Sequence, residues 1–174
     1  MIGGDPNSIN SEIIYKTWKQ LSNSIKKNLY LIANYKLICN QFKKLNLKIK
    51  TLKVKNIDEG ANLSFLKIID IPISFNDPFN VSRSNASKYV KSSFNYAHKL
   101  ASNKKIKGFI NCPVDKILIS EKKIRGITEF LAAKSKIKKD SEVMLIHNKK
   151  LSVVPLTTHI NIKDISKNIN IDLI

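Results

Sequence analysis

The chain has few of the residues and patterns that would place it in a specialised class. Its only cysteines are Cys39 and Cys112, too few for a disulfide framework or a zinc site, so a reducing, cytoplasmic location is expected. No run of about 18 apolar residues occurs, which predicts no membrane-spanning helix. The start, MIGGDPNSIN, lacks the basic and apolar regions of a signal peptide. With 43% hydrophobic residues in 174, we expect one folded domain, or one lobe of a larger protein.

Arginine is also scarce, and this bears on the net charge of +18. The only arginines are Arg83 and Arg125, although arginine is the residue that suits bidentate contacts to phosphates and bases. The lysines are spread from Lys16 to Lys167 beside many Ile and Asn residues, a composition that AT-rich codons produce. This spread favours solvated lysine faces over a nucleic-acid surface, so we expect no nucleic-acid partner.

Alternating helical and extended patterns predict an α/β fold with a mostly parallel sheet. Asn10 or Ser11 can cap the first helix, with Glu12 in its first turn. Helices are predicted over residues 10–21, 36–45, 85–101, 128–135 and 161–169, and strands over residues 30–33, 49–54, 63–73, 108–110, 143–147 and 151–154. The last two strands form a predicted hairpin. Because parallel sheets carry their chemistry in loops at the carboxyl ends of strands, three such loops are candidates.

The first candidate loop, residues 3–10 (GGDPNSIN), opens a helix. Glycines before a helix amino terminus suit an anionic ligand, because free N–H groups and the helix dipole point outward. The pattern is neither GxGxxG nor a P-loop. A simple capped turn is therefore an open alternative.

The second loop, residues 111–116 (NCPVDK), follows a predicted strand. Lys116 could neutralise a phosphate or carboxylate, or it could form a local ion pair with Asp115. Cys112 could be a nucleophile, but no histidine is near it in the sequence, which favours a small buried residue.

The third loop, residues 155–159 (PLTTH), places two hydroxyls and the His159 imidazole at the end of a strand. A lone histidine is more often structural than a ligand, and a metal site needs three or four ligands. His98 and His147 fall in a predicted helix and near the hairpin turn, and the sequence does not bring them to His159.

Taken in order, these segments resemble the 4-hydroxythreonine-4-phosphate dehydrogenase family of pyridoxal phosphate biosynthesis. Residues 4–13, GDPNSINSEI, are similar to the family's GDPAGIGPEI. GFINCPVDK at 108–116 resembles its TGPVNK loop, and GITEFLAAKS at 126–135 resembles GHTEFFAERS. LSVVPLTTHINIKDI at 151–165 resembles RVALVTTHLPLRDI.

The resemblance implies a three-layer α/β/α sandwich of the isocitrate/isopropylmalate dehydrogenase type, with the active site in a cleft of a homodimer. It also implies oxidation of a secondary alcohol by hydride transfer to NAD, followed by decarboxylation. The implied substrate is a small phosphorylated amino acid. A divalent metal (Zn, Mg or Co) would assist as a Lewis acid.

The resemblance also assigns roles to four residues. His159 falls on the metal-binding histidine of TTH, and Thr128 on the substrate-binding threonine of GHTE. Lys116 matches the lysine of the PVNK loop. Ile127 stands where the family has a substrate-binding histidine, and an isoleucine cannot make that hydrogen bond.

Family members are about twice as long, and their second half supplies two further metal histidines and much of the NAD site. We therefore expect residues 1–174 to be a single α/β region equivalent to the family's amino-terminal half, truncated at both ends and inactive alone. Only Met1 and Ile2 precede the first glycine. The alternative is a diverged, non-catalytic paralogue or a basic binding module.

Overall fold

The computed structural model describes residues 1–59, 65–120, 126–135, 142–157, 160–169 and 171. The chain divides into two compact units, Met1–Ser135 and Lys136–Ile174. The first unit holds the sheet, its helices and both apolar clusters. The second unit holds a hairpin and two short helical turns.

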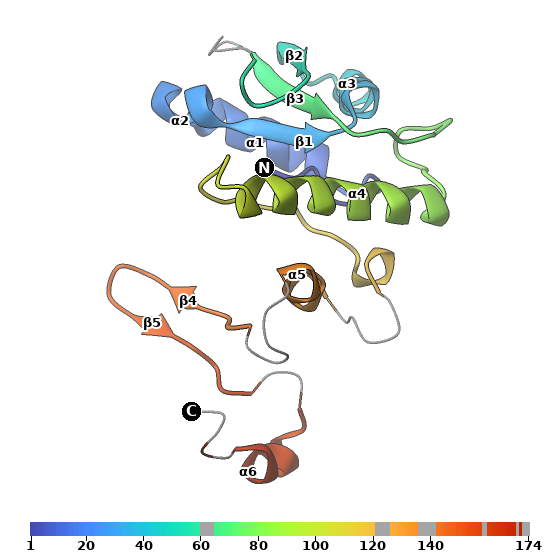
Figure 1. The fold of residues 1–174 in the computed structure, drawn as a ribbon. Coiled ribbons are helices and arrows are strands. Elements are labelled where there is room, and N and C mark those ends of the chain that lie inside the picture. The colour runs from blue at the N-terminus through green and yellow to red at the C-terminus, as the bar shows by residue number, and fades with distance from the viewer. Residues whose placement is uncertain (60–64, 121–125, 136–141, 158–159, 170, 172–174) are drawn as a thin grey trace. The chain divides into compact units, whose positions relative to one another are not determined.

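Three parallel strands form the sheet of the first unit, in the order β1-β3-β2. They are β1 (Tyr30–Ala33), β2 (Thr51–Val54) and β3 (Leu66–Asp70) (Figure 1). The central strand β3 is buried along Leu66–Ile69, as expected for a parallel strand covered on both faces. The predicted α/β fold with a parallel sheet is confirmed, although β3 is shorter than the predicted 63–73, and residues 63 and 64 lie outside the described residues.

Helices connect and cover these strands. They are α1 (Asn10–Gln20), α2 (Asn23–Asn28), α3 (Tyr35–Lys44) and α4 (Arg83–Ser102). Asn34 caps α3 by accepting from the Leu37 amide, and Ser82 caps α4 by accepting from the Asn85 amide. The predicted cap of α1 is wrong: the cap position is Ile9, no side chain caps the helix, and Asn10 lies inside the first turn.

The segment Met1–Gly3 extends the sheet. Ile2 bridges in parallel to Ile32 of β1 on one side and to Asn111 on the other. The Ile2 amide donates to the Ile110 carbonyl at 2.8 Å, and the Cys112 amide donates to the Ile2 carbonyl at 3.0 Å. The predicted strand over 108–110 is therefore wrong in extent, because only the single bridge at Asn111 pairs there.

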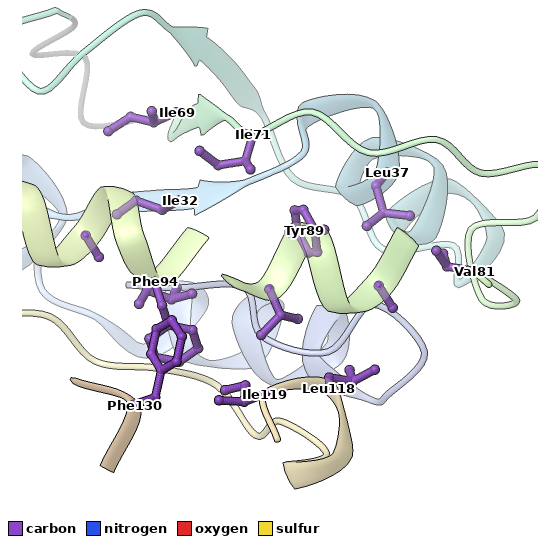
Figure 2. Packing of buried hydrophobic residues seen from close by; sticks show 14 of the residues in the cluster. Ile32, Leu37, Ile69, Ile71, Val81, Tyr89, Phe94, Leu118, Ile119 and Phe130 are labelled. Carbon is purple, nitrogen blue, oxygen red and sulfur yellow. The ribbon is translucent and has the colours of Figure 1, made fainter. Parts of the chain in front are cut away.

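Side chains of alternate strand residues reach two apolar clusters, one on each face of the sheet. One cluster joins Ile32, Ile69 and Ile71 to the α4 residues Tyr89 and Phe94, and Figure 2 shows these side chains between the sheet and α4. The other cluster lies against α1 and α3 and contains Ile14, Trp18, Leu31, Ala33, Ile38, Phe42, Leu66, Ile68 and Cys112. Helices thus cover both faces of the sheet.

Helix α2 is missing from the predictions because its sequence, NSIKKN, has no apolar stripe. It meets the sheet through Lys67, whose side chain is fully buried on β3. The Lys67 ammonium donates to the Lys27 carbonyl at 2.6 Å and lies 4.2 Å from the centroid of the Tyr30 ring. Burial lowers the pKa of Lys67. A cation at the carboxyl end of α2 also complements the helix dipole.

The remaining elements of the first unit are η1 (Lys116–Leu118) and α5 (Ile127–Ser135). Both pack on α4: Leu118 and Ile119 are buried in its cluster, and Phe130 of α5 lies edge-on to Phe94 with 6.3 Å between ring centroids (Figure 2). The predicted helix over 128–135 is confirmed.

The second unit contains the antiparallel pair β4 (Ile146–His147) and β5 (Ser152–Val153), followed by η2 (Ile162–Asp164) and α6 (Ile165–Asn168). The predicted hairpin is confirmed with shorter strands, and the predicted final helix is divided between η2 and α6. In the part of the chain that the structure describes, no helix combines the length and apolar character needed to cross a bilayer.

Candidate functional site at the carboxyl edge of the sheet

The loop Gly3–Ser8 lies at the carboxyl edge of the sheet and is fixed by neighbours from distant parts of the chain. Asn7 exchanges hydrogen bonds with Val81: its amide group donates to the Val81 carbonyl at 2.9 Å, and its side-chain oxygen accepts from the Val81 amide at 2.8 Å. The buried Gln41 amide donates at 2.7 Å to the carbonyls of both Pro6 and Pro78. These bonds hold the loop at the edge where parallel sheets carry their ligands.

Asn10 joins this loop to the second candidate loop. Its side-chain amide donates to the Pro113 carbonyl at 2.8 Å and to the Asp5 carbonyl at 3.2 Å. Gly4 has φ +73°, and a Cβ there would come within 2.6 Å of both the Asn10 amide nitrogen and the Pro113 carbonyl. Gly4 is therefore required both for its conformation and for this close approach.

Two buried polar atoms near this junction have no hydrogen-bond partner among the described residues. They are the Asn10 side-chain oxygen and the Ser11 hydroxyl. Ser11 lies one helical turn before the core residue Ile14 on the same face of α1, and it is almost fully buried. Both atoms lie in the first turn of α1. This is the position where the sequence suits an anionic ligand.

Asp70, at the end of β3, forms a cluster that the sequence analysis missed. One carboxylate oxygen accepts from the Tyr35 amide at 2.8 Å and from the Asn34 side chain at 3.1 Å, and the other pairs with Lys53 at 2.6 Å. The Tyr89 hydroxyl accepts from the Asn34 amide at 3.2 Å, and burial raises the pKa of Tyr89. The available signal was a polar residue at the end of two buried strands, Asn34 directly after β1 and Asp70 as the last residue of β3. The bonds of Asp70 order the start of α3, which is a structural role.

Lys116 is exposed at the start of η1. The Asp115 carboxylate caps η1 by accepting from the Ile117 amide at 3.0 Å, and Lys116 takes no part in the ion pairs Lys44–Asp77 and Lys53–Asp70. The side chain of Lys116 is thus available to solvent. Cys112 is buried, as expected for a structural residue, and burial raises the pKa of its thiol, which lowers its nucleophilicity.

Thr128 and Ile127 occupy the first turn of α5 with different surroundings. Thr128 is exposed, whereas Ile127 is partly buried and packs against the α4 cluster. At the other end of the helix, the Ser135 hydroxyl lies 3.0 Å from the His98 Nε2. Position 127 is therefore occupied by a packing residue.

Helix α4 holds the segments that carry Lys116 and Thr128 at two different places along its length. The η1 turn is attached near its amino end, where the Ser87 hydroxyl donates to the Leu118 carbonyl at 2.7 Å. Helix α5 is attached at Phe94, seven residues later, which corresponds to about 10 Å along a helix axis. Both Lys116 and Thr128 thus belong to segments packed on α4. His159 and Thr158 lie outside the described residues.

The described residues do not form a metal site. They contain no group of three or more His, Cys, Asp or Glu side chains placed to hold an ion. His98 bonds to Ser135, and the His147 Nδ1 lies 2.7 Å from the Ser152 hydroxyl. A cavity of about 550 Å³ is lined by Met1, Tyr30 and Phe109 among others, and its lining residues belong to none of the three candidate loops.

Solved structures share this fold. The chain resembles the structure of a 4-hydroxythreonine-4-phosphate dehydrogenase from Burkholderia phymatum with a TM-score of 0.83 and 22% identity, over 99% of this chain and 53% of that chain. The corresponding structure from Klebsiella pneumoniae gives a TM-score of 0.84 and 21% identity, over 99% of this chain and 54% of that one.

The sequence comparisons identify the family as well as the fold. The chain is 31% identical over 172 residues to the 4-hydroxythreonine-4-phosphate dehydrogenase of Sulfurihydrogenibium sp. (strain YO3AOP1), covering 95% of this chain and 51% of that protein. It is 36% identical over 133 residues to the enzyme of the same name from Wigglesworthia glossinidia brevipalpis, covering 75% of this chain and 38% of that protein. The chain spans about half or less of the length of these curated relatives. The profile of the family described as Pyridoxal phosphate biosynthetic protein PdxA matches residues 24–174, and the chain therefore belongs to the PdxA family.

Proposed function

We propose that this chain forms the amino-terminal half of an NAD- and divalent-metal-dependent 4-hydroxythreonine-4-phosphate dehydrogenase. The observation that carries the proposal is the family match over residues 24–174, which includes all four residues to which the resemblance assigns roles. The complete enzyme would be a homodimer of α/β/α sandwiches of the isocitrate/isopropylmalate dehydrogenase type. Residues 1–174 would be one α/β region of that enzyme, and the rest would come from sequence beyond it.

The proposed reaction oxidises the secondary alcohol of a phosphorylated amino acid. The hydride of the carbinol carbon passes to NAD and the hydroxyl proton passes to a base, which leaves a ketone β to the carboxylate. That β-keto acid loses carbon dioxide, its α-carbon takes up a proton in place of the carboxylate, and an amino-ketone phosphate results. NAD supplies the hydride chemistry, while the protein binds and orients the substrate.

In this proposal two exposed side chains of the first unit contact the substrate. The Thr128 hydroxyl can donate to or accept from substrate oxygens, and its exposure leaves it accessible. The Lys116 ammonium can neutralise a phosphate or carboxylate, because no described residue pairs with it. The hydrogen bonds from Asn10 to both candidate loops would fix the position of the Lys116 loop.

The described residues do not fit the implied metal. His159, outside the described residues, is the position that the resemblance assigns to a metal. Because catalytic metal sites commonly use three protein ligands, the remaining donors would come from sequence beyond these 174 residues. No reaction step is therefore assigned to a metal on this chain.

The packing of Ile127 favours one second candidate, a diverged PdxA paralogue without this activity. Ile127 stands at the position of the family's substrate-binding histidine and packs against the α4 cluster. Replacing Ile127 by a ligand-binding residue would remove its packing contacts and lower the stability of the fold. The isoleucine at position 127 is therefore consistent with a paralogue that binds a different substrate or that has lost catalysis.

A chimera tests the proposed function. The 174-residue chain is joined to the second half of the Aquifex aeolicus relative, which is 29% identical over 168 residues, and NAD reduction is followed with phosphorylated hydroxythreonine. We expect turnover that a chelator removes, and a loss of about tenfold or more in metal affinity for His159→Ala. His98→Ala is the matched control. It also removes a histidine, but the His98 imidazole bonds to Ser135 on α5 and is not a proposed metal ligand. A folded, metal-loaded chimera that does not reduce NAD would favour the paralogue.

A further inference from the structure

The fold gathers five lysines from separate parts of the sequence on one face of the first unit. Two open depressions of about 490 and 520 Å³ lie on this face, and they adjoin, because Lys48, Ile49 and Lys50 line both of them. We define the lysine face by the lysines that line these depressions: Lys19, Lys26, Lys43, Lys48 and Lys50. They come from α1, α2, α3 and the segment before β2. Lysines that are spread along the sequence are thus neighbours in the structure.

The lysine face carries its positive charge without compensating carboxylates. No Asp or Glu is among the described residues that line the two depressions. The nearby lysines Lys44 and Lys53 pair with Asp77 and Asp70, whereas none of the five lysines of this face takes part in those ion pairs. Like charges gathered on one face raise the local positive potential, which attracts polyanions.

The packing of residues 47–50 directs two of the lysines outward. Leu47 and Ile49 pack against the cluster between the sheet and helices α1 and α3, whereas Lys48 and Lys50 are exposed. Alternate residues of an extended segment point the same way. The two ammonium groups therefore lie on the same side of the chain, where a ligand can meet both.

Aromatic rings hold two of the lysine side chains in place. The Lys26 ammonium lies 5.5 Å from the centroid of the Trp18 ring, and the Lys50 ammonium lies 5.8 Å from that of Phe65. Side chains that are already ordered lose less conformational entropy when a ligand binds. Trp18 is only 4% exposed, so its ring is not free to stack on a nucleobase. Recognition on this face would therefore use charge rather than stacking.

These features fit a flexible chain of phosphates better than a membrane. Five cations around two adjoining depressions can meet several phosphates of one strand, and a single strand can bend to follow them. Binding to a membrane interface needs exposed apolar side chains. The apolar residues that line the depressions, such as Phe42 and Leu47, are instead buried or half-buried. Lysine contacts a phosphate as a point charge and without the bidentate geometry of arginine, which predicts little sequence preference.

We propose that the lysine face binds single-stranded nucleic acid through its phosphates. The expectation of no nucleic-acid partner rested on the spread of lysines along the sequence, whereas this inference rests on their clustering in the fold. It goes beyond the proposed dehydrogenase function and uses none of the residues assigned to substrate or metal. Either proposal can therefore fail without the other.

Fluorescence anisotropy of a labelled oligouridylate of about 20 nucleotides tests the proposal with the full 174-residue chain. Five phosphate contacts to a single strand predict a slope of about −3.5 for log affinity against log salt, which is a loss of about 100-fold between about 50 and 200 mM KCl. A mixed-sequence oligonucleotide should bind with similar affinity. Because Lys26 lies over the Trp18 ring, the emission of this only tryptophan should change on binding.

A triple variant and a charge-matched control locate the binding. The variant Lys43→Gln, Lys48→Gln, Lys50→Gln should reduce the slope to about −1.4 and weaken binding at the lowest salt at least tenfold. The control variant Lys99→Gln, Lys105→Gln, Lys107→Gln removes the same charge from exposed residues on or just after α4, which packs on the opposite face of the sheet. It should leave the slope unchanged.

Circular dichroism checks that both variants fold. If the triple variant does not fold, single substitutions at Lys48 and Lys50 replace it, and each should lower the slope by about 0.7. No binding of the oligonucleotide at about 50 mM KCl would overturn the proposal, whether or not anionic lipid vesicles bind. Equal weakening by the lysine-face and control variants would also overturn it, because binding would then follow net charge rather than this face.

Discussion

Residues Met1–Ser135 and Lys136–Ile174 follow one another in the same chain but differ in how they are stabilised. The first unit encloses a parallel sheet between two apolar clusters. The second has a regular turn and paired strands, yet none of its described residues is buried. Because burial of apolar surface is the dominant favourable term in folding, local hydrogen bonds alone leave the second unit dependent on other contacts. Four predictions follow from this contrast, in decreasing order of the change in stability that we expect.

The largest effect is expected from removing a core ring. Phe94 is fully buried and lies edge-on to Phe109 and Phe130, so Phe94→Ala should lower the free energy of unfolding by about 4 kcal/mol. Val153→Ala, at a side chain that is 45% exposed, should change it by under about 0.5 kcal/mol. Urea unfolding followed by tryptophan fluorescence measures both, and similar costs would contradict the contrast between the units.

The second prediction concerns the buried amino group of Met1, which donates to the Tyr30 carbonyl at 2.8 Å. Burial lowers its pKa from 8.0 to about 6. Between these values the unfolded chain binds more protons than the folded chain, so stability rises with pH across this window, by about 2 kcal/mol, and is lowest below pH 6. Urea midpoints at pH 5.5 and pH 8.5 measure the rise.

A control variant separates the effect of the amino group from that of the histidine side chains. A variant carrying His98→Gln and His147→Gln should keep the rise in stability, since the two side chains bond to Ser135 and Ser152 and not to Met1. A flat or falling pH profile in the chain with a free Met1 amine would count against a buried amino group.

The third prediction compares a buried hydrogen-bonding side chain with an exposed one. Gln41→Ala removes both bonds to the Pro6 and Pro78 carbonyls and should cost about 2 kcal/mol, because it leaves buried acceptors unsatisfied. Ser152→Ala removes the exposed bond to His147 and should cost under about 0.5 kcal/mol. Thermal unfolding of the two variants measures both losses of stability. Equal shifts in melting temperature would show that burial of the hydrogen bond does not determine its contribution.

The smallest effect is expected at position 127. Because Ile127 packs against the α4 cluster, Ile127→His should lower stability by about 1 kcal/mol, while Thr128→His at the exposed neighbour should change it little. Chemical denaturation of both variants gives the comparison. A neutral Ile127→His substitution would mean that the packing of Ile127 does not oppose the family's histidine at this position.

Much of the fold could be predicted because its signals are local. The apolar positions Tyr89, Val90, Phe94 and Ala97 repeat at helical spacing, and they are the buried face of α4. The short strand Tyr30–Ala33 was predicted with its observed bounds. Helix α2 is absent from the predictions because its six residues contain a single apolar side chain, Ile25, and therefore no such repeat. Asn10 was assigned to a cap because its residue type suits one, whereas its actual partners, Asp5 and Pro113, are carbonyls of two loops.

The candidate site was predictable only in part. The family motifs identify Lys116, Thr128 and Ile127, and the structure places all three in segments that pack on α4. Ile127 packs toward the core while Thr128 is exposed. This difference depends on the orientation of α5 about its axis where it packs on Phe94, and no sequence motif gives that orientation. The cluster around Asp70 was missed because its members, Asn34, Tyr35 and Lys53, become neighbours only when β1, β2 and β3 pair.

The sequence by itself determined the alternation of helices and strands, the parallel α/β class and the PdxA family motifs, because each depends on residues close together in the chain. The tertiary structure alone determines that Ile2 lies between β1 and Asn111 and that the Lys67 side chain is fully buried with its ammonium against the Lys27 carbonyl. These outcomes depend on which distant segments meet, and that is settled by the total surface buried and hydrogen bonds satisfied across the folded chain rather than by any local pattern.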